Sequence, residues 1–279
     1  MSQATTDAGG FRENRLLTAW QAGKATLNGW LSIPEPFAAE AMARVGWDSL
    51  TIDMQHGLID YQRALQMLIA ISTTPTVPLA RVPWLEEGIV MKMLDAGAYG
   101  IICPMVNTRA DAERLARACR YAPRGIRSFG PTRARLYAGD DYERRANDTV
   151  LAIAMIETRE ALDSLEAILD VPDLSGVYIG PSDLSLALGK EPKFDQEDPV
   201  VLGAIERIIT TARKARKRVG IHNGTVAYAE RMIGLGADFV TVGSDLRLLT
   251  AGAQQVVSAF RQHHGRGAAQ DPPAAHHER

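Results

Sequence analysis

The sequence has few of the features that mark secreted, membrane or nucleic-acid-binding proteins. Its 279 residues include two cysteines, too few for a disulfide framework. No apolar run approaches the roughly 20 residues that span a bilayer, and no basic segment followed by an apolar one opens the chain as a signal peptide would. The formal net charge is −2, so no general attraction to nucleic acid or to an anionic membrane is implied. These absences favour a cytoplasmic protein whose partner is a small molecule.

The chain also lacks the Gly-x-Gly-x-x-Gly turn that follows the first strand of dinucleotide-binding folds. It has instead eight short, apolar, β-rich runs that alternate with helical patterns, and the runs are apolar throughout, as strands covered on both faces are. Eight units in about 250 residues fit a closed barrel better than an open doubly wound sheet. We therefore predict an α/β fold, a (β/α)8 TIM barrel. The expected strands are Leu27–Ser32, Ser49–Asp53, Val77–Val82, Gly100–Met105, Val150–Ile156, Gly176–Ile179, Val219–His222 and Phe239–Val242. The expected helices are Glu35–Val45, Tyr61–Ser72, Glu86–Ala96, Arg109–Tyr121, Arg159–Leu169, Pro199–Arg216, Val226–Leu235 and Leu246–Gln262.

Both ends of the chain are poor in residues that could be buried. Residues 1–10 are small and polar, and residues 264–279 are mostly Gly, Ala, Pro, His and charged residues. Such segments cannot bury enough apolar surface to fold. We expect one barrel domain over residues 11–263, between two disordered ends.

One connection, Ala122–Thr149, is abnormally long. It has no clear helical pattern, and unstructured loops of this length are usually functional or packed at an interface. The segment is rich in arginine and in acidic residues. Two interpretations stay open: a solvated loop of mixed charge, or a lid or subunit contact that offers guanidinium groups to an anionic ligand.

In a barrel of this kind the chemistry sits at the carboxyl ends of the strands. Glu157 follows the fifth expected strand, and Asp183 follows the sixth. Two carboxylates on adjacent strand ends suit a hard divalent cation, which prefers oxygen ligands. Each carboxylate could instead cap the helix that follows it, so both interpretations stay open at this point.

Two further polar side chains stand at strand ends. Arg81 is expected to point into the mouth of the barrel, where it could form an ion pair or stabilise an enolate as charge develops on a substrate oxygen. His56, beside the permissive Gly57, could be a structural histidine or a general base. None of the six lysines falls at a strand end, which weighs against a lysine Schiff base and leaves a metal ion as the electron sink.

A set of short motifs occurs in a fixed order along the chain. They are Asp53-Met54-Gln55-His56-Gly57, Arg81, Leu94-Asp95-Ala96-Gly97-Ala98, Pro104-Met105-Val106, Pro123-Arg124-Gly125-Ile126-Arg127, Ile156-Glu157-Thr158, Gly180-Pro181-Ser182-Asp183-Leu184-Ser185 and Val242-Gly243-Ser244-Asp245. Together they resemble the HpcH/HpaI class II pyruvate aldolases, which act on 4-hydroxy-2-oxoheptanedioate and on 2-dehydro-3-deoxy sugar acids; macrophomate synthase is also similar. The resemblance runs from about Leu27 to Leu249 and implies a barrel of the phosphoenolpyruvate/pyruvate type.

The resemblance implies a role for each residue at the strand ends. Glu157 and Asp183 would bind a Mg2+, Mn2+ or Co2+ ion that pyruvate chelates through its 2-oxo and carboxylate oxygens. Arg81 would bind the 2-oxo oxygen and stabilise the enolate. His56 would move the proton, through a metal-bound water, and Asp95 would raise the basicity of His56. A simple barrel nevertheless places Asp95, which precedes the fourth strand, near the opposite face.

The resemblance also implies a substrate pocket. Backbone N–H groups around Ser182, in Gly180-Pro181-Ser182, would hold the substrate carboxylate. Two positions depart from the family's usual pattern: Gln55 stands where these aldolases commonly have Glu, and Met155 where many have a substrate-contacting Gln. Met155 cannot form a strong hydrogen bond, so both positions bear on substrate preference.

The activity that follows is retro-aldol cleavage of a 4-hydroxy-2-oxo acid to pyruvate, or a close 2-oxo acid, and an aldehyde. One alternative is a 2-oxo acid decarboxylase, acting on oxaloacetate, or a condensing enzyme that uses the same enolate. A second is a ligand-binding barrel without catalysis. The resemblance further implies a homo-oligomer, a hexamer built as a trimer of dimers whose chains exchange their last helix.

Overall fold

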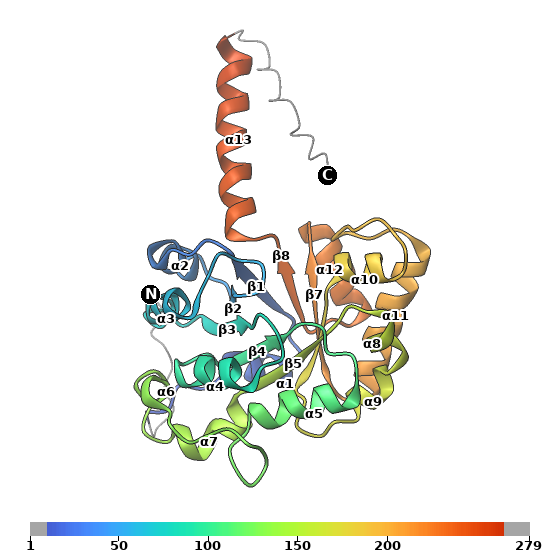
Figure 1. The fold of residues 1–279 in the computed structure, drawn as a ribbon. Coiled ribbons are helices and arrows are strands. Elements are labelled where there is room, and N and C mark those ends of the chain that lie inside the picture. Colours follow the sequence, from blue (N-terminus) through green and yellow to red (C-terminus); the bar gives the residue numbers. More distant parts are fainter. Residues whose placement is uncertain (1–9, 265–279) are drawn as a thin grey trace, which may run out of the picture. The chain divides into compact units, whose positions relative to one another are not determined.

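The structure, a computed structural model, describes residues 10–264 and is built around a closed β-barrel (Figure 1). Eight parallel strands pair in chain order, and β1 closes the barrel against β8. The predicted (β/α)8 barrel is confirmed. The strands are β1 Thr26–Leu31, β2 Ser49–Asp53, β3 Val77–Arg81, β4 Gly100–Cys103, β5 Leu151–Ile156, β6 Gly176–Ile179, β7 Arg218–Asn223 and β8 Phe239–Val242.

Burial on both faces explains why the strands are apolar throughout. Every residue of β5 is buried, and successive residues belong alternately to two hydrophobic clusters. Ile153 and Met155 share one cluster with the aromatic rings of Tyr178 and Phe239. Ile156 belongs to the other cluster, which lies between the strands and the helices. Because side chains alternate across a strand, the two clusters fix which residues point into the barrel.

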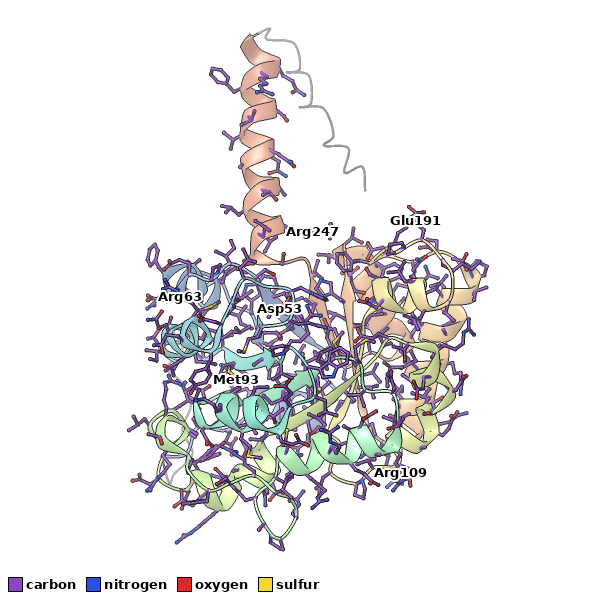
Figure 2. The ribbon with its side chains drawn as sticks, in the orientation of Figure 1. Asp53, Arg63, Met93, Arg109, Glu191 and Arg247 are labelled. Carbon is purple, nitrogen blue, oxygen red and sulfur yellow. The ribbon has the colours of Figure 1, made fainter. Side chains whose placement is uncertain are left out.

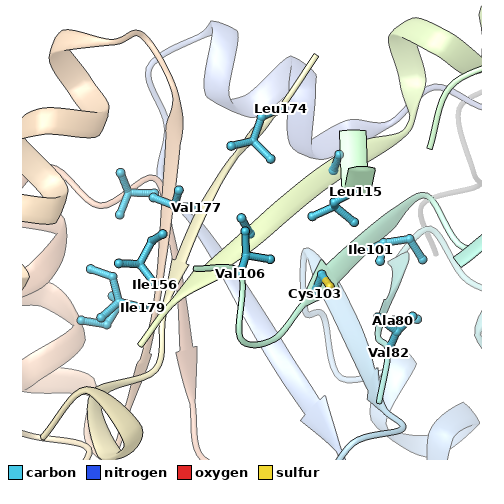
Figure 3. Packing of buried hydrophobic residues seen from close by; sticks show 14 of the residues in the cluster. Ala80, Val82, Ile101, Cys103, Val106, Leu115, Ile156, Leu174, Val177 and Ile179 are labelled. Atoms are coloured by element: carbon cyan, nitrogen blue, oxygen red, sulfur yellow. The ribbon is translucent and has the colours of Figure 1, made fainter. Parts of the chain in front are cut away.

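The outer cluster joins the strands to the surrounding helices. Figure 3 shows part of it, including Ile101 and Cys103 of β4 and Leu115 of α5. Cys103 and Cys119 are both buried and free, as their apolar surroundings suggest. This packing holds the strands parallel, so their carboxyl ends meet at one rim of the barrel.

Helices cover the outside of the barrel (Figure 1). Several begin with an N-cap side chain that accepts a backbone N–H, such as Asp60, Thr108 and Thr158. The covering helices are α1 Arg15–Gln21, α2 Pro36–Ala43, α3 Tyr61–Ile71, α4 Glu87–Asp95, α5 Arg109–Ala118, α6 Thr132–Ala138, α7 Tyr142–Thr149, α8 Arg159–Asp163, α9 Leu165–Leu169, α10 Pro181–Ala187, α11 Pro199–Lys214 and α12 Val226–Leu235. The last helix of the described chain is α13 Asp245–His264.

The prediction of a long unstructured connection over Ala122–Thr149 was wrong, because α6 and α7 lie within it. Their buried positions include Ala134, Ala138 and Ala146, which are small and separated by charged residues. Such positions give little apolar periodicity. The break between the two helices at Gly139, whose φ is 105°, further shortens each pattern.

The α6–α7 segment packs at the amino-terminal ends of the strands. Tyr137 of α6 meets the ring of Tyr99, which directly precedes β4, at 4.9 Å between centroids. The segment therefore lies at the rim opposite the carboxyl ends and does not cover the carboxyl-end mouth of its own chain, while a subunit contact stays a prediction. Its arginines are used within the chain: Arg127 pairs with Asp95 at 2.6 Å, and Arg124 pairs with Asp148 at the same distance.

By internal contacts the chain divides into two units between Asp245 and Leu246. The first contains the barrel and its covering helices, and α13 continues into the second. The ends predicted to be disordered lie outside the described residues, apart from one residue of each. No helix within residues 10–264 is long and apolar enough to cross a membrane.

Candidate active site

Two charged residues at neighbouring strand ends form the first part of the site. Asp53 ends β2 and Arg81 ends β3, and the two residues are paired in the parallel register. Arg81 donates from Nε to Asp53 Oδ1 at 2.9 Å and from Nη2 to Oδ2 at 2.6 Å. Their side chains are 10% and 3% exposed. This buried, bidentate ion pair holds the guanidinium group of Arg81 in one orientation. Asp53 is labelled in Figure 2.

Asp53 anchors this part of the site. It also accepts Trp30 Nε1–H at 3.1 Å and the backbone N–H groups of Gln55 and His56 at 3.0 and 3.2 Å. Burial alone would raise the pKa of Asp53, but the hydrogen bonds and positive charge of Arg81, with the bond from Trp30, lower that pKa overall. The Arg81 guanidinium also lies 4.8 Å from the centroid of the Trp30 ring. The carboxylate therefore stays ionised and fixes both Arg81 and the turn after β2.

The turn after β2 presents His56. A Cβ on Gly57 would lie 2.3 Å from the carbonyl oxygen of Asp53, so only glycine permits this tight return of the chain. His56 is exposed, and its imidazole has no hydrogen-bond partner among residues 10–264. The side chain is thus held at the carboxyl-end rim by its backbone and is available to a ligand.

Glu157 forms the second part of the site, directly after β5. It is 3% exposed and accepts the backbone N–H of Met105 at 2.8 Å. Met105 adopts a φ of 54°, which is uncommon outside glycine. Burial raises the pKa of Glu157 to about 7; the negative charge of Asp183 adds to this rise, while the Met105 hydrogen bond and the Arg81 charge oppose it. Arg81 itself is paired with Asp53, so Glu157 is a buried carboxylate without a paired cation.

Asp183 stands in the first turn of α10, next to Glu157. The junction between β6 and α10 passes close to Glu157, because a Cβ on Gly180 would lie 2.6 Å from Glu157 Oε2 and 3.1 Å from Met155 Cε. Pro181 opens the helix and has no N–H, so the backbone N–H groups of Ser182 and Asp183 are the donors that this helix end leaves without helical acceptors.

Glu157 and Asp183 fit a hard divalent cation. Glu157 follows β5, and Asp183 follows the adjacent strand β6. The negative charge of Asp183 raises the pKa of Glu157, and a bound cation would relieve this repulsion. No group of three or more His, Cys, Asp or Glu side chains suited to a metal occurs among the described residues. An ion here would have two protein carboxylates and would take its other ligands from substrate and water, as Mg2+ commonly does.

Comparison with known proteins agrees with this geometry. Residues 28–251 match the family described as HpcH/HpaI aldolase/citrate lyase. The chain belongs to this family. The membership expected from the sequence motifs is confirmed.

Related proteins match over most of their length. A hydroxypyruvate/pyruvate aldolase from Rhizorhabdus wittichii is 47% identical over 89% of this chain and 99% of the relative. A 4-hydroxy-2-oxo-heptane-1,7-dioate aldolase from Salmonella dublin is 38% identical over 89% of this chain and 95% of the relative. A solved HpcH/HpaI family protein from Burkholderia cenocepacia has a TM-score of 0.83 and 31% identity, covering 89% of this chain and 99% of that one.

Two residues that the HpcH/HpaI resemblance singled out lie outside the open part of the site. Asp95 ends α4 and therefore lies at the amino-terminal rim, where it pairs with Arg127. Within one chain the height of the barrel separates Asp95 from His56. The geometry of one chain therefore does not explain how Asp95 would raise the basicity of His56. Met155 is 2% exposed and packs below Gly180 rather than standing open at the rim.

Three residues that matter to this HpcH/HpaI site were not predicted. Asp53 and Trp30 hold Arg81, and Met105 holds Glu157. A signal existed for Asp53, since it ends a strand next to the strand that Arg81 ends. Met105 lies in one of the motifs that carry the resemblance, but its contact with Glu157 could not be predicted, because it depends on a left-handed backbone conformation.

Proposed function

We propose that this chain is a class II aldolase that cleaves a 4-hydroxy-2-oxo acid to pyruvate, or to a close 2-oxo acid such as hydroxypyruvate, and an aldehyde. The observation that carries the proposal is the joint placement of a fixed Arg81, a free His56 and the Glu157–Asp183 pair at one rim of the barrel. Relatives that this chain matches over nearly their whole length are named as aldolases of such substrates.

Glu157 and Asp183 would hold Mg2+, Mn2+ or Co2+. The cation supplies positive charge that polarises the 2-oxo group of the substrate. Met105 donates its backbone N–H to Oε1 of Glu157, and Gly180 has no side chain beside Oε2, so Oε2 would be the oxygen that Glu157 offers to the ion.

Arg81 stabilises the charge that develops as the carbon–carbon bond breaks. Its Nε and Nη2 are committed to Asp53, and Nη1 has no acceptor among the described residues. Nη1 is therefore the donor that meets the 2-oxo oxygen when electrons move onto it and form the enolate. The fixed orientation matters because no reorganisation is then needed during the reaction.

His56 carries the proton of the cleavage step. It accepts the proton from the C4 hydroxyl, the C3–C4 bond breaks, the aldehyde leaves, and the bonding electrons pass to the enolate. Protonation at C3 then gives the 2-oxo acid. The N–H groups of Ser182 and Asp183 at the start of α10 would hold the carboxylate of the 2-oxo acid, with Gly180 and the apolar side chain of Met155 beneath it.

The alternatives receive less support. A decarboxylase or condensing enzyme would use the same enolate, but the relatives named above are aldolases. A non-catalytic barrel would not require a bidentate anchor for Arg81 beside an unpaired buried carboxylate. We further propose a cytoplasmic homo-oligomer, a hexamer, as the resemblance implies.

The test is a pyruvate-release screen over 4-hydroxy-2-oxo acids, with Mg2+, Mn2+ and Co2+ each added to metal-free protein. We expect release that depends on the metal and exceeds CO2 release from oxaloacetate. Release of CO2 alone, with no 4-hydroxy-2-oxo acid cleaved, would identify a decarboxylase instead.

A further inference from the structure

The rim opposite the proposed active site contains a basic cavity. It has a volume of about 360 Å³, at the small end of the range of small-molecule pockets. Three connections line it, each leading into the amino end of a strand: the residues before β1, before β7 and before β8. The basic residues that line it are Lys24, Arg213, Arg216, Lys217 and Arg218, against one acidic residue, Asp238.

Two of the five cations are satisfied by the protein. Arg218 pairs with Asp238 at 2.8 Å. Lys217 donates to the carbonyl oxygens of Val171 and Leu174 at 2.7 Å each. Folding alone therefore accounts for the positions of these two side chains.

The other three cations are not satisfied in this way. Within residues 10–264, no ion pair involves Lys24, Arg213 or Arg216, although most arginines elsewhere in that range are paired with carboxylates. Arg213 reaches only the carbonyl oxygen of Gly236, at 3.4 Å. The carboxyl-terminal ends of α1, α11 and α12 each carry a partial charge of about −0.5. Together they offset about half of the positive charge of the three cations. A net positive charge therefore remains around the cavity.

The backbone at Arg216 adds an independent observation. Its φ is 58°, a left-handed conformation at the end of α11, where glycine is the favoured residue. Placing arginine there costs stability. Gly236, with a φ of 113°, makes room on the other side: a Cβ there would lie 2.4 Å from Arg213 Nη1. The conformation of each loop thus brings a guanidinium to the cavity.

We propose that this cavity binds a compact multivalent oxyanion, held by Lys24, Arg213 and Arg216 at the amino-terminal rim of the barrel. Guanidinium groups bind phosphate and carboxylate oxygens through paired, charge-assisted hydrogen bonds, and Lys24 adds a point charge from the loop before β1. The site is separate from the proposed catalytic rim and does not depend on the proposed aldolase activity.

The experiment is calorimetric titration of the full-length, metal-free protein with inorganic pyrophosphate, and separately with tricarballylate, at constant ionic strength. Metal-free protein prevents either anion from acting by chelation. Arg213→Ala and Arg216→Ala should each weaken binding about tenfold or more, as loss of a charge-assisted contact does. The anion that binds more tightly identifies the phosphoryl or the carboxylate source.

Three variants distinguish binding in the cavity from binding elsewhere on the protein. Arg63→Ala removes an exposed arginine on α3 (Figure 2) and should leave the affinity within about twofold. Arg216→Gly relieves the left-handed strain, so it should raise the melting temperature and still weaken binding as much as Arg216→Ala. Arg81→Ala tests whether the anion binds at the catalytic rim.

The proposal is overturned if neither anion binds, or if Arg63→Ala weakens binding as much as the cavity variants do. It is also overturned if Arg81→Ala abolishes binding while Arg213→Ala and Arg216→Ala leave it intact. Loss of affinity confined to the cavity variants supports it.

Discussion

Arg81 and His56 stand at neighbouring strand ends and share Asp53 as their anchor, yet they should fail differently when mutated. Arg81 acts on the enolate, through which both aldol cleavage and oxaloacetate decarboxylation pass. Losing one preorganised donor typically costs ~10²–10³ in rate, so Arg81→Ala should depress both reactions. Arg81→Lys should not restore them, because a lysine cannot form two parallel hydrogen bonds to Asp53.

His56 handles the proton of the substrate hydroxyl, a step that decarboxylation of oxaloacetate lacks. His56→Ala should therefore slow cleavage by ~10²–10⁴ and spare most of the decarboxylation. Both reactions are measured for both variants at saturating metal. An equal proportional loss of the two activities in His56→Ala would show that His56 is structural rather than a proton carrier.

At this scale the sequence identified residue types and strand ends well, but not their partners. Arg81, Glu157 and Asp183 were placed correctly at the carboxyl-end rim because each follows an unmistakable apolar strand. The sequence left open whether Arg81 forms an ion pair. The structure pairs it with Asp53, and this partner could not be named in advance because it depends on the register between β2 and β3. The role assigned to Asp95 came from the resemblance alone, and within one chain Asp95 pairs at the other rim.

The junction between β6 and α10 is the element on which the geometry of Glu157 depends. Gly180→Ala would place a methyl group 2.6 Å from Glu157 Oε2 and 3.1 Å from Met155 Cε. Both are the mobile ends of side chains, so the fold can adjust while the carboxylate is displaced. We expect kcat/KM to fall by ~10² while the free energy of unfolding falls by about 1–3 kcal/mol, too little to unfold the protein.

Gly203→Ala in α11 is the matched control, because a Cβ there meets nothing within 4 Å. It should leave activity unchanged and raise the free energy of unfolding by about 0.5–1 kcal/mol. Urea unfolding measures the free energy of unfolding of the two variants, and steady-state kinetics measures their kcat/KM. Full activity in Gly180→Ala would mean that the close approach to Glu157 is not needed.

The elements that could be predicted are those with a strong physical signature. All eight strands were found, since burial on both faces makes them continuous apolar runs. The helices α1, α6, α7 and α10 were missed, and each spans only seven or eight residues. A short helix is held by tertiary contacts rather than by its own propensity, so its sequence carries little signal.

The molecule as a whole is expected to associate. Phe37, Leu58 and Trp84 are 78%, 84% and 52% exposed, and they lie in the segments that follow β1, β2 and β3, on the catalytic rim. Exposed apolar side chains gathered on one side commonly mark an association surface. Light scattering should give an oligomer, and Leu58→Asp should weaken it, whereas Leu136→Asp on α6 at the opposite rim should not. A stable, fully active monomer would contradict this expectation.

The dependence on a metal held by Glu157 and Asp183 is the central claim, and one measurement tests it most directly. Pyruvate release from a 4-hydroxy-2-oxo acid is followed after EDTA treatment and dialysis, and again after Mg2+, Mn2+ or Co2+ is restored. The wild-type protein and Glu160→Gln, an exposed residue on α8, should lose activity and regain it, while Glu157→Gln should stay inactive and bind no metal with its fold intact. Undiminished release from the metal-free protein, or a pyruvate adduct trapped by borohydride, would contradict the account.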